Sequence, residues 1–344
     1  MSRKATTRLI AALSVGLVLT ACTGNTPAAQ TGGGDQGGAR VANDEPGKKV
    51  VIGFSAPAAD HGWMAAISDS AKKEAEKYSD VELKVVEGTN DVNLQISQVE
   101  TFINDKVDAI VLLPFDGAAL TPVALKAMKA GITVINVDRA FDSPFAARST
   151  VLGDNYGMGV SAGTYICQQL GGKSGAVVAE IAGIDSLPLT QDRSKGFADA
   201  LGDCGLKVNN RVAAEFTVES GERAAANLLQ AAPRIDAIWN HDDDQGVGVT
   251  AAIKNSGRSE FFLVGGAGSA NVMREIKAGN GLHKATVVYP STQGADGIRL
   301  ARLAVQGKSL GDLVEVEVPR QVELFAPVVT KDTVDRYLPT AFES

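Results

Sequence analysis

Short apolar runs alternate with amphipathic stretches from Lys49 to near the end of the chain. The apolar runs, for example 50–54 and 109–113, are rich in Val and Ile, a composition typical of strands buried on both faces. The stretches between them carry apolar residues at helical spacing, as in 63–78. This regular alternation predicts parallel sheets covered by helices on both faces.

The alternation runs through two consecutive sets of elements. In the first set, strands are predicted at 50–54, 83–86, 109–113 and 133–137, with helices at 63–78, 95–103 and 120–130. In the second set, helices are predicted at 156–170, 193–201, 222–231, 246–255 and 271–278, and strands at 176–181, 211–216, 237–240, 261–264 and 285–288. A last helix at 294–306 precedes a strand-like segment at 314–318. The predicted fold class is α/β, with two doubly wound, Rossmann-like lobes.

The N-terminus has the features of an export signal. Positive charge at Arg3, Lys4 and Arg8 is followed by an apolar stretch that suits a signal peptide and is too short to span a bilayer. The stretch ends in Leu19-Thr20-Ala21-Cys22, which resembles the bacterial lipobox, where the Cys receives a diacylglyceryl group. We expect a lipoprotein signal peptide at 1–21 and lipidation of Cys22. The alternative is an ordinary signal peptide that happens to contain a Cys.

The segment 22–48 is rich in Gly, Ala, Thr, Asn and Gln and has almost no large apolar side chains. Such a segment cannot bury enough surface to offset its ordering entropy, so a flexible tether is predicted. The rest of the chain, roughly 300 residues, is long enough for two domains. No later apolar run approaches the length of a membrane span.

Charge and cysteine content restrict the function further. Removal of the signal peptide takes away its three cationic residues and changes the formal net charge from −7 to −10. An acidic chain argues against a nucleic-acid partner. If Cys22 is lipidated, Cys167 and Cys204 remain as a pair in an oxidising compartment, and we expect a disulfide within one lobe. The alternative is two buried free thiols.

Polar and aromatic residues stand directly after the predicted strands. In doubly wound sheets, ligands bind in the crevice at the carboxyl ends of the strands. The residues in these places are Asp60, His61 and Trp63 after the first strand, Phe115 and Asp116 after the third, Asp138 and Arg139 after the fourth, and Asn240–Asp244 in the second lobe. Carboxylates accept hydrogen bonds from hydroxyl groups and aromatic rings cover C–H surfaces, a combination that suits a sugar.

Several short motifs carry a resemblance to a known family. They are Ile52-Gly53-Phe54-Ser55 followed by Gly62-Trp63, the trio Val137-Asp138-Arg139, the stretch Gln191-Asp192-Arg193-Ser194-Lys195-Gly196-Phe197, the single residue Phe216, and Asn240-His241-Asp242-Asp243-Asp244. In order and spacing they resemble the type I periplasmic sugar-binding family, the ribose- and galactofuranose-binding proteins of ABC importers. The resemblance covers about Val50 to the C-terminus and implies the type I periplasmic binding protein fold.

The resemblance also implies a set of ligand-binding residues. They are Asp60, His61, Trp63, Phe115, Asp138, Arg139, Gln191, Arg193, Phe216 and Asp242. Asp138 and Arg139 match a pair that hydrogen-bonds sugar hydroxyls, and Trp63 and Phe216 match aromatic residues that cover the sugar. Asp242 holds the place of a ligand-binding Asn.

Departures from the family pattern weaken the case for ribose itself. Gln191 stands where ribose-type proteins carry an Arg, and Gly268 replaces a family Asp. Val287 or Val288 stands where a Gln or Glu is found. A different pentose, a furanose or an open-chain polyol is consistent with the loss of these polar groups.

Most of the candidate residues also have structural interpretations. These are a core position for Trp63 and Phe115, a helix cap for Asp60, a structural hydrogen bond for His61, an ion pair of Asp138 with Arg139, solvent-facing positions for Gln191 and Arg193, and a Ca²⁺ site for Asp242–Asp244. No EF-hand-type Gly and Glu spacing follows the acidic run, so no metal site is predicted.

The residues and the resemblance together predict a solute-binding lipoprotein of an ABC importer. Two lobes are expected to close over a monosaccharide or sugar alcohol and to deliver it to a permease. The lobe boundaries are 49–153 plus 289–318 for the N-terminal lobe and 154–288 plus 319–344 for the C-terminal lobe, with a three-segment hinge near Gly153, Tyr289 and Pro319. We expect a monomer without cofactor at the extracytoplasmic face of the cell membrane, held there by its lipid.

Other functions fit the sequence less well. An enzyme is not predicted, because the chain has no Gly-x-Ser-x-Gly elbow, no His-Glu-x-x-His helix, no Walker-type loop and only three His residues. A sugar sensor of the same fold, presenting its ligand to a membrane receptor, is an alternative that the sequence does not separate from transport. A LacI-type regulator is disfavoured by the lipobox and by the missing N-terminal DNA-binding helices.

Overall fold

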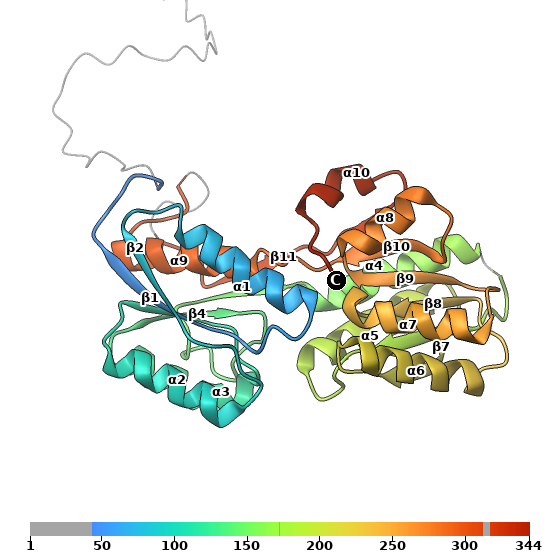
Figure 1. Ribbon diagram of the computed structural model, residues 1–344, viewed down its shortest axis with the longest axis horizontal. Helices are drawn as coiled ribbons and strands as arrows, with labels where there is room; N and C mark the ends of the chain where they lie inside the picture. Colours follow the sequence, from blue (N-terminus) through green and yellow to red (C-terminus); the bar gives the residue numbers. More distant parts are fainter. Residues whose placement is uncertain (1–42, 172, 312–316) are drawn as a thin grey trace, which may run out of the picture. The chain divides into compact units, whose positions relative to one another are not determined.

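The computed structural model describes residues 43–171, 173–311 and 317–344. The predicted signal peptide, Cys22 and most of the predicted tether lie outside these residues. The described residues belong to one unit that contains two six-stranded sheets (Figure 1). Among them, no helix combines the length and the apolar character that a membrane crossing requires.

The first sheet has the strand order β11-β5-β4-β3-β1-β2, and all of its pairings are parallel. Its strands are β1 (Val50–Ser55), β2 (Val81–Val85), β3 (Ala109–Leu112), β4 (Thr133–Val137), β5 (Ser149–Gly153) and β11 (Gln321–Leu324). The helices of this lobe are α1 (Gly62–Ala75), α2 (Val92–Asn104), α3 (Gly117–Lys129) and α9 (Gln293–Gln306).

The second sheet has the order β12-β10-β9-β8-β6-β7, in which only the pairing of β12 with β10 is antiparallel. Its strands are β6 (Val178–Ala182), β7 (Val208–Ala213), β8 (Ala237–Asn240), β9 (Phe262–Ala267), β10 (His283–Val288) and β12 (Val328–Thr330). The helices are α4 (Asn155–Leu170), α5 (Pro188–Asp203), α6 (Val218–Ala231), α7 (Asp243–Ser256), α8 (Ala270–Ala278), α10 (Val334–Tyr337) and the 3-10 helix Leu338–Thr340.

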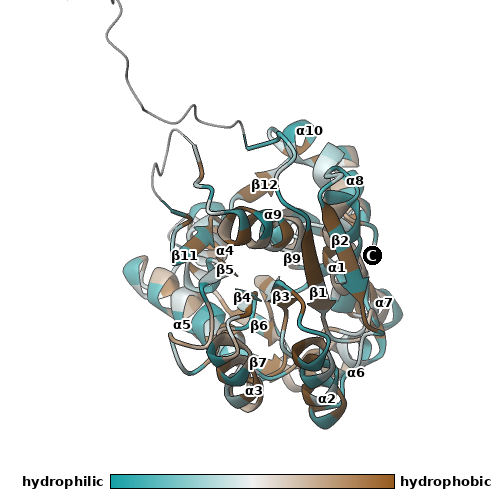
Figure 2. Cartoon of the chain, turned by 90° about the vertical axis from the view of Figure 1, so that its left-hand side faces the viewer, coloured by the Kyte–Doolittle hydropathy of each residue, from teal (hydrophilic) through white to brown (hydrophobic). Residues whose placement is uncertain are grey.

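Strand β3 is apolar at every position because both of its faces are buried. Successive side chains point to opposite faces, so Val111 packs in the core with Ile67 and Ile298 of α1 and α9, while Ile110 and Leu112 pack with side chains of α2 and α3. Helices α1 and α9 lie on one face of the first sheet, and α2 and α3 on the other (Figure 1). Figure 2 likewise shows β1 as a hydrophobic strand. Two covered sheets confirm the predicted α/β class.

The chain crosses between the two sheets after Gly153, after Val288 and after Leu324. The hinge positions predicted from the sequence are Gly153, Tyr289 and Pro319. The boundary near Pro319 is wrong, because β11 pairs in parallel with β5 and so adds 321–324 to the sheet of the first lobe. The strand predicted at 314–318 lies largely outside the described residues, and its described part is not a strand.

Some predicted boundaries move by part of an element. Helix α5 begins at Pro188, a residue favoured in the first turn, whereas the sequence predicts a start at Arg193. Gln191 therefore lies on the helix and not in a loop before it. Strands β5, β11 and β12 were not predicted; each is partly exposed and lacks a long apolar run.

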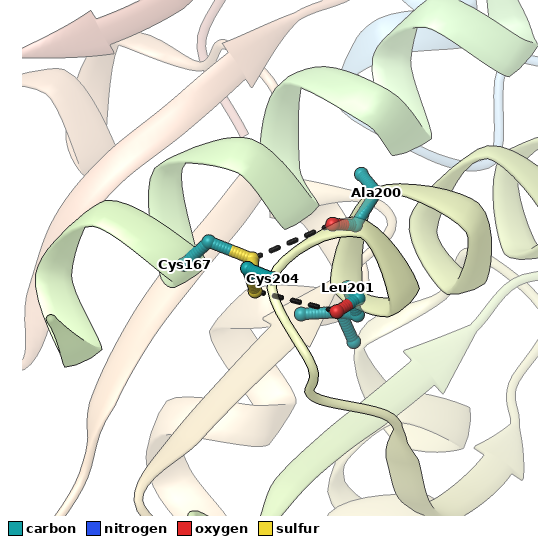
Figure 3. The surroundings of a disulfide bond; sticks show 4 residues. All are labelled: Cys167, Ala200, Leu201 and Cys204. Carbon is teal, nitrogen blue, oxygen red and sulfur yellow. Dashed lines mark hydrogen bonds between the residues drawn. A yellow bond between two sulfur atoms is a disulfide. The ribbon is translucent and has the colours of Figure 1, made fainter. Parts of the chain in front are cut away.

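The second lobe contains a disulfide between Cys167 and Cys204, as expected from the cysteine count (Figure 3). Cys167 lies near the end of α4, and Cys204 directly follows α5. The two sulfur atoms lie near the carbonyl oxygens of Ala200 and Leu201, at 3.5 and 3.3 Å. The bond ties together the C-terminal ends of two neighbouring helices, well within one lobe.

Candidate ligand-binding site

A small cavity lies where the carboxyl ends of strands from both sheets meet. Its volume is about 30 Å³, and its lining residues come from both lobes. The predicted residues that line it are His61, Trp63, Asp138, Arg139, Arg193, Phe216 and Asp242, joined by Met64, Leu189 and Tyr289. A neighbouring space of about 250 Å³ shares Asp138, Arg139 and Leu189 with it. A larger surface hollow of about 790 Å³ lies elsewhere and contains none of the predicted residues.

The cavity lies at the switch points of both sheets. In the first sheet the chain leaves β1 toward β2 on one side and β3 on the other, and in the second sheet β6 stands between β7 and β8 in the same way. Crevices form at such points because consecutive connections go to opposite faces of the sheet. His61 follows β1, and Asp242 follows β8.

Asp138 follows β4 in a left-handed backbone conformation, with φ of 65°. Its amide N–H donates to the Val151 carbonyl oxygen at 2.8 Å, which holds this conformation against the neighbouring strand. A non-glycine residue in this region costs of order 1–3 kcal/mol, and such residues cluster at functional sites. The turn directs the buried carboxylate of Asp138 into the cavity.

Arg139 presents an unused donor to the same space. Its Nη1 donates to the Phe115 carbonyl oxygen at 2.6 Å, and its Nε lies 3.8 Å from Oδ2 of Asp138. Among the described residues this buried Nε has no hydrogen-bond partner. Burial lowers the pKa of the Arg139 guanidinium, and the charge of Asp138 opposes this shift. A buried, charged donor without a partner favours an incoming acceptor.

A chain of hydrogen bonds joins the two lobes through Tyr289. The Tyr289 hydroxyl donates to Oδ1 of Asp138 at 2.6 Å and accepts from Nδ2 of Asn155 at 3.3 Å. Oδ1 of Asn155 accepts from Nε of Arg193 at 2.9 Å. Burial, reinforced by the Asp138 charge, raises the pKa of the Tyr289 hydroxyl, which therefore stays protonated as a donor. The Tyr289 ring packs so closely on Gly153 that a Cβ there would overlap it.

Arg193 lies between aromatic faces on the side of the second lobe. Its guanidinium carbon lies 4.5 Å from the centre of the Tyr289 ring and 5.9 Å from that of Phe216. Its Nη1 donates to the His241 carbonyl oxygen at 3.4 Å. The side chain is therefore buried and fixed, and not a solvent-facing residue at a helix start.

Trp63 connects α1 to the opposite lobe. Its indole N–H donates to the Tyr289 carbonyl oxygen at 3.1 Å, and its ring is tilted against the Tyr289 ring at 5.4 Å. Its backbone N–H donates to Oδ2 of Asp244 at 2.9 Å. Asp244, from the first turn of α7, thus supplies an acceptor at the N-terminus of α1.

Asp60 does not cap α1, and its capping interpretation is wrong. Its Oδ1 accepts from Nδ1 of His61 at 2.6 Å, and its Oδ2 accepts from Nδ2 of Asn90 at 2.8 Å. These bonds fix the His61 ring, which stacks against Phe216 of the other lobe at 6.4 Å. Asp60 therefore orients a residue of the cavity wall without lining the cavity itself.

Phe216 also has a left-handed backbone, with φ of 63°. Its N–H donates to Oε1 of Gln245 at 3.2 Å, and Nε2 of Gln245 donates to Oδ1 of Asn240 at 2.7 Å. Asn240 in turn donates to the Asp242 carbonyl oxygen. One buried amide, that of Gln245, thus holds both Phe216 and the turn that carries Asp242.

The acidic run after β8 divides into three different environments. Oδ1 of Asp242 accepts from the N–H groups of Asp244 and Gln245, which makes Asp242 the N-cap of α7. Asp243 accepts from Gly266, Ser269 and Thr286, so it supports the turn after β9. Burial raises the pKa of the Asp243 carboxyl to about 6. No metal-binding group of His, Cys, Asp or Glu side chains occurs in the part of the chain that the structure describes.

Two predicted ligand residues lie away from the cavity. Phe115 lies behind Arg139, with its ring centre 5.7 Å from the guanidinium carbon. Gln191 is exposed, and its Nε2 donates to the Asp185 carbonyl oxygen at 3.3 Å. Neither lines the cavity or the neighbouring space. Gln191 does not take the place of the family Arg here, because it is on the outward side of α5.

Several residues of the site were not among the predicted ligand-binding residues. They are Met64, Asn155, Leu189, Gln245 and, above all, Tyr289, which was placed only in the hinge. Tyr289 follows directly after β10, so the rule used for the other strands also applies to it. No local signal marks Gln245, whose partners come from elsewhere in the fold.

The arrangement can bind a small molecule from two sides. Donors, acceptors and aromatic faces converge from both lobes, and no residue pair in the cavity has the geometry of a nucleophile with its base. An α/β fold of two lobes with such a cavity at the strand ends is typical of proteins that bind small molecules.

The chain belongs to the periplasmic binding protein family: the periplasmic binding protein domain matches residues 52–309. It is 30% identical over 239 residues to the ribose import binding protein of Bacillus subtilis (strain 168), covering 70% of this chain and 76% of the relative. It is 27% identical over 338 residues to the xylitol-binding protein of Mycolicibacterium smegmatis, and the match covers 95% of this chain and 86% of the relative. Among solved structures, a protein from Mycobacterium smegmatis in complex with β-D-fucofuranose matches with a TM-score of 0.75 and 25% sequence identity. The match covers 84% of this chain and 94% of that protein.

These likenesses confirm the predicted family and the two-lobed fold. The protein is a binding protein and not an enzyme. Membership of a periplasmic family also indicates an extracytoplasmic location.

Proposed function

We propose that the protein captures a neutral monosaccharide or sugar alcohol between its lobes and delivers it to an ABC permease. The observation that carries this proposal is the convergence of polar groups from both lobes on one cavity. Asp138 and Arg139 come from the first lobe, and Arg193 and Asp242 from the second. Trp63 and Phe216 supply aromatic faces beside them, which suits the C–H surfaces of a polyol.

The named relatives support the ligand class. They include a ribose import protein, a xylitol-binding protein and a structure that holds a fucofuranose. Furanoses, pentoses and open-chain polyols share a small carbon skeleton with several hydroxyl groups. Such a ligand offers donors to Asp138 and acceptors to the unpartnered Nε of Arg139.

Closure of the lobes follows from the positions of the crossings. The three crossing segments after Gly153, Val288 and Leu324 act as the hinge. A ligand that touches both lobes favours the closed state by its differential affinity for that state. The permease then recognises the closed, loaded form. A diacyl anchor on Cys22 would hold the protein at the outer face of the membrane, close to the permease.

A thermal-shift screen tests the ligand class. The panel is D-ribose, L-arabinose, D-galactose, D-fucose, D-fructose, xylitol and myo-inositol. A ligand at a hundredfold excess over its Kd stabilises the protein by about 2.7 kcal/mol, which gives a clear rise in Tm. The absence of a shift with every member of the panel would overturn the sugar and polyol assignment.

Two Asp variants locate the binding site. Asp138→Ala removes the acceptor at the end of β4 and is expected to abolish the ligand-induced shift. Asp105→Ala is the control, because Asp105 is an exposed residue whose one ion pair among the described residues is with Lys84, at 3.1 Å. The control should keep the full shift. A shift that survives in Asp138→Ala would show that the ligand binds elsewhere.

A further inference from the structure

Asp242 has one carboxyl oxygen in use and one free. Its Oδ1 accepts two backbone N–H groups at the start of α7, at 2.8 and 3.3 Å. Its Oδ2 has no hydrogen-bond partner among the described residues, and the side chain lines the cavity although the residue is only 5% exposed. The free oxygen is therefore available to a molecule in the cavity.

The surroundings of Asp242 are rich in carboxylates. Asp243 and Asp244 follow it directly, and both are buried. Asp243 is satisfied by N–H and hydroxyl donors, and Asp244 accepts the N–H of Trp63. Three buried carboxylates in sequence favour protonation of one of them, because each negative charge disfavours the ionised form of its neighbours.

Asp242 forms no ion pair within the described residues, although the charge of Arg193 opposes the rise in the pKa of its carboxyl. The charged or titratable groups that face the same cavity are His61 ahead of α1, Asp138 and Arg139 after β4, Arg193 on α5 and Tyr289 after β10. Arg193 directs its Nε to Asn155 and its Nη1 to the His241 carbonyl oxygen, and forms no ion pair with Asp242. Nδ1 of His61 donates to Asp60.

The titration of Asp242 follows from this environment. Burial, and then the charges of Asp244 and Asp243, raise the pKa of the Asp242 carboxyl well above its ordinary value. A protonated carboxyl offers one O–H donor and retains an acceptor, whereas a carboxylate only accepts.

We propose that Asp242 binds the ligand as a neutral carboxylic acid, donating a hydrogen bond from Oδ2–H to a ligand oxygen. The inference rests on the proposed function and names the chemistry that the ligand must offer at this point: an acceptor oxygen, such as a ring oxygen or a hydroxyl lone pair. Asp242 then acts as a specificity residue that also makes binding depend on pH. Since the protonated form binds, affinity falls by up to about tenfold per pH unit above the pKa of Asp242 in the unliganded protein.

Isothermal titration of the full chain between pH 5 and 8 tests this inference. The probe is the member of D-ribose, D-galactose, xylitol and myo-inositol that gives the largest thermal shift at pH 5. Wild type should show a Kd that rises with pH. Asp242→Asn keeps a donor and loses the titration, so its Kd should be constant over the range. Asp105→Asn, on the exposed surface, should reproduce the wild-type profile.

A second readout does not need a ligand. The side-chain carboxyl carbons of Asp are followed by ¹³C NMR during a pH titration of the unliganded protein. A resonance that titrates above the ordinary Asp range in wild type and is absent from Asp242→Asn supports the inference. If the carboxyl resonance that disappears in Asp242→Asn titrates in the ordinary Asp range, the inference is wrong, whether or not a sugar binds.

The outcomes separate this inference from the proposed function. Binding by wild type with a constant Kd, or with a Kd that falls as pH rises, overturns the neutral-acid role of Asp242 while the binding function stands. The same pH dependence in Asp242→Asn as in wild type also overturns it. If no probe binds at any pH, the proposed function fails, and the NMR titration alone decides the state of Asp242.

Discussion

The hydroxyl of Tyr289 donates a 2.6 Å hydrogen bond to Oδ1 of Asp138, and so a residue of the second crossing segment holds the carboxylate at the end of β4. The same hydroxyl accepts from Asn155, which follows the first crossing. Two of the three segments that join the lobes therefore meet at one carboxylate of the cavity. This geometry couples the hinge to the site, because movement of either crossing changes the surroundings of Asp138.

The Tyr289–Asp138 bond should contribute measurably to stability. Tyr289→Phe removes the hydroxyl donor to the buried Oδ1 of Asp138, whereas the Asn155 amide still donates to the Gly153 carbonyl oxygen. A buried hydrogen bond to a charged group is worth about 1.5–3 kcal/mol. We expect the free energy of unfolding in urea to fall by this amount. A double-mutant cycle with Asp138→Asn should give a stabilising coupling energy between the two side chains.

Tyr165→Phe is the matched control for that cycle. Its hydroxyl donates to the Lys284 carbonyl oxygen at 3.2 Å in a more exposed place, so its loss should cost about 0.5–1 kcal/mol and show no coupling to Asp138. A coupling energy of zero between Tyr289 and Asp138 would contradict the role given to this bond.

The contact between Asp244 and the N-terminus of α1 should favour the closed lobes. Asp244→Ala removes the acceptor for the Trp63 N–H, and a lost acceptor at a helix N-terminus costs about 0.5–2 kcal/mol. Since donor and acceptor belong to different lobes, this cost falls on the closed state. We expect small-angle X-ray scattering to show a larger radius of gyration for the unliganded variant than for wild type.

Asp91→Ala separates capping from closure. Asp91 caps α2 through the N–H groups of Asn93 and Leu94, all within the first lobe. Its loss should lower Tm and leave the radius of gyration unchanged. An unchanged radius of gyration in Asp244→Ala as well would show that the contact does not hold the lobes together.

The order of strands and helices is largely predictable from the sequence, whereas the links between distant residues are not. Buried strands such as β3 are continuous apolar runs, and this signal is strong because both faces are covered. The rule that ligand residues follow strands also places Asp138 and Asp242 correctly beside the cavity. Strand β11 escapes prediction because its exposed edge alternates Gln, Val, Glu and Leu.

Capping at α1 shows where a local interpretation fails. Asp60 precedes the helix and suggests a cap, yet the acceptor at Trp63 is Asp244, 181 residues away. Gln191 shows the same limit, since helix α5 begins earlier than its apolar pattern indicates and turns Gln191 outward. Tertiary contacts decide both cases, and no spacing in the sequence encodes them.

Gly183 controls the position of Phe216 in the cavity wall. A Cβ at Gly183 would overlap the Phe216 ring, so Gly183→Ala should push the ring toward the ligand space. Because the displaced ring overpacks the liganded state, we expect a cost of about 1–3 kcal/mol in the free energy of binding, a rise in Kd of about fivefold to 150-fold. Gly202→Ala is the control, because nothing lies within 4 Å of the added methyl group, and its Kd should match wild type. Equal Kd values for Gly183→Ala and wild type would place Phe216 outside the binding surface.

The disulfide should stabilise the second lobe without affecting ligand binding. It closes a loop with a sequence separation of 37, for which loop entropy gives a stabilisation of about 3–4 kcal/mol. The double variant Cys167→Ser/Cys204→Ser should lose stability of this order in urea and keep the wild-type Kd, because neither cysteine lines the cavity. Dithiothreitol should lower the stability of wild type to that of the double variant and leave the variant unchanged. If the reductant lowers the stability of both proteins equally, the loss does not come from this bond.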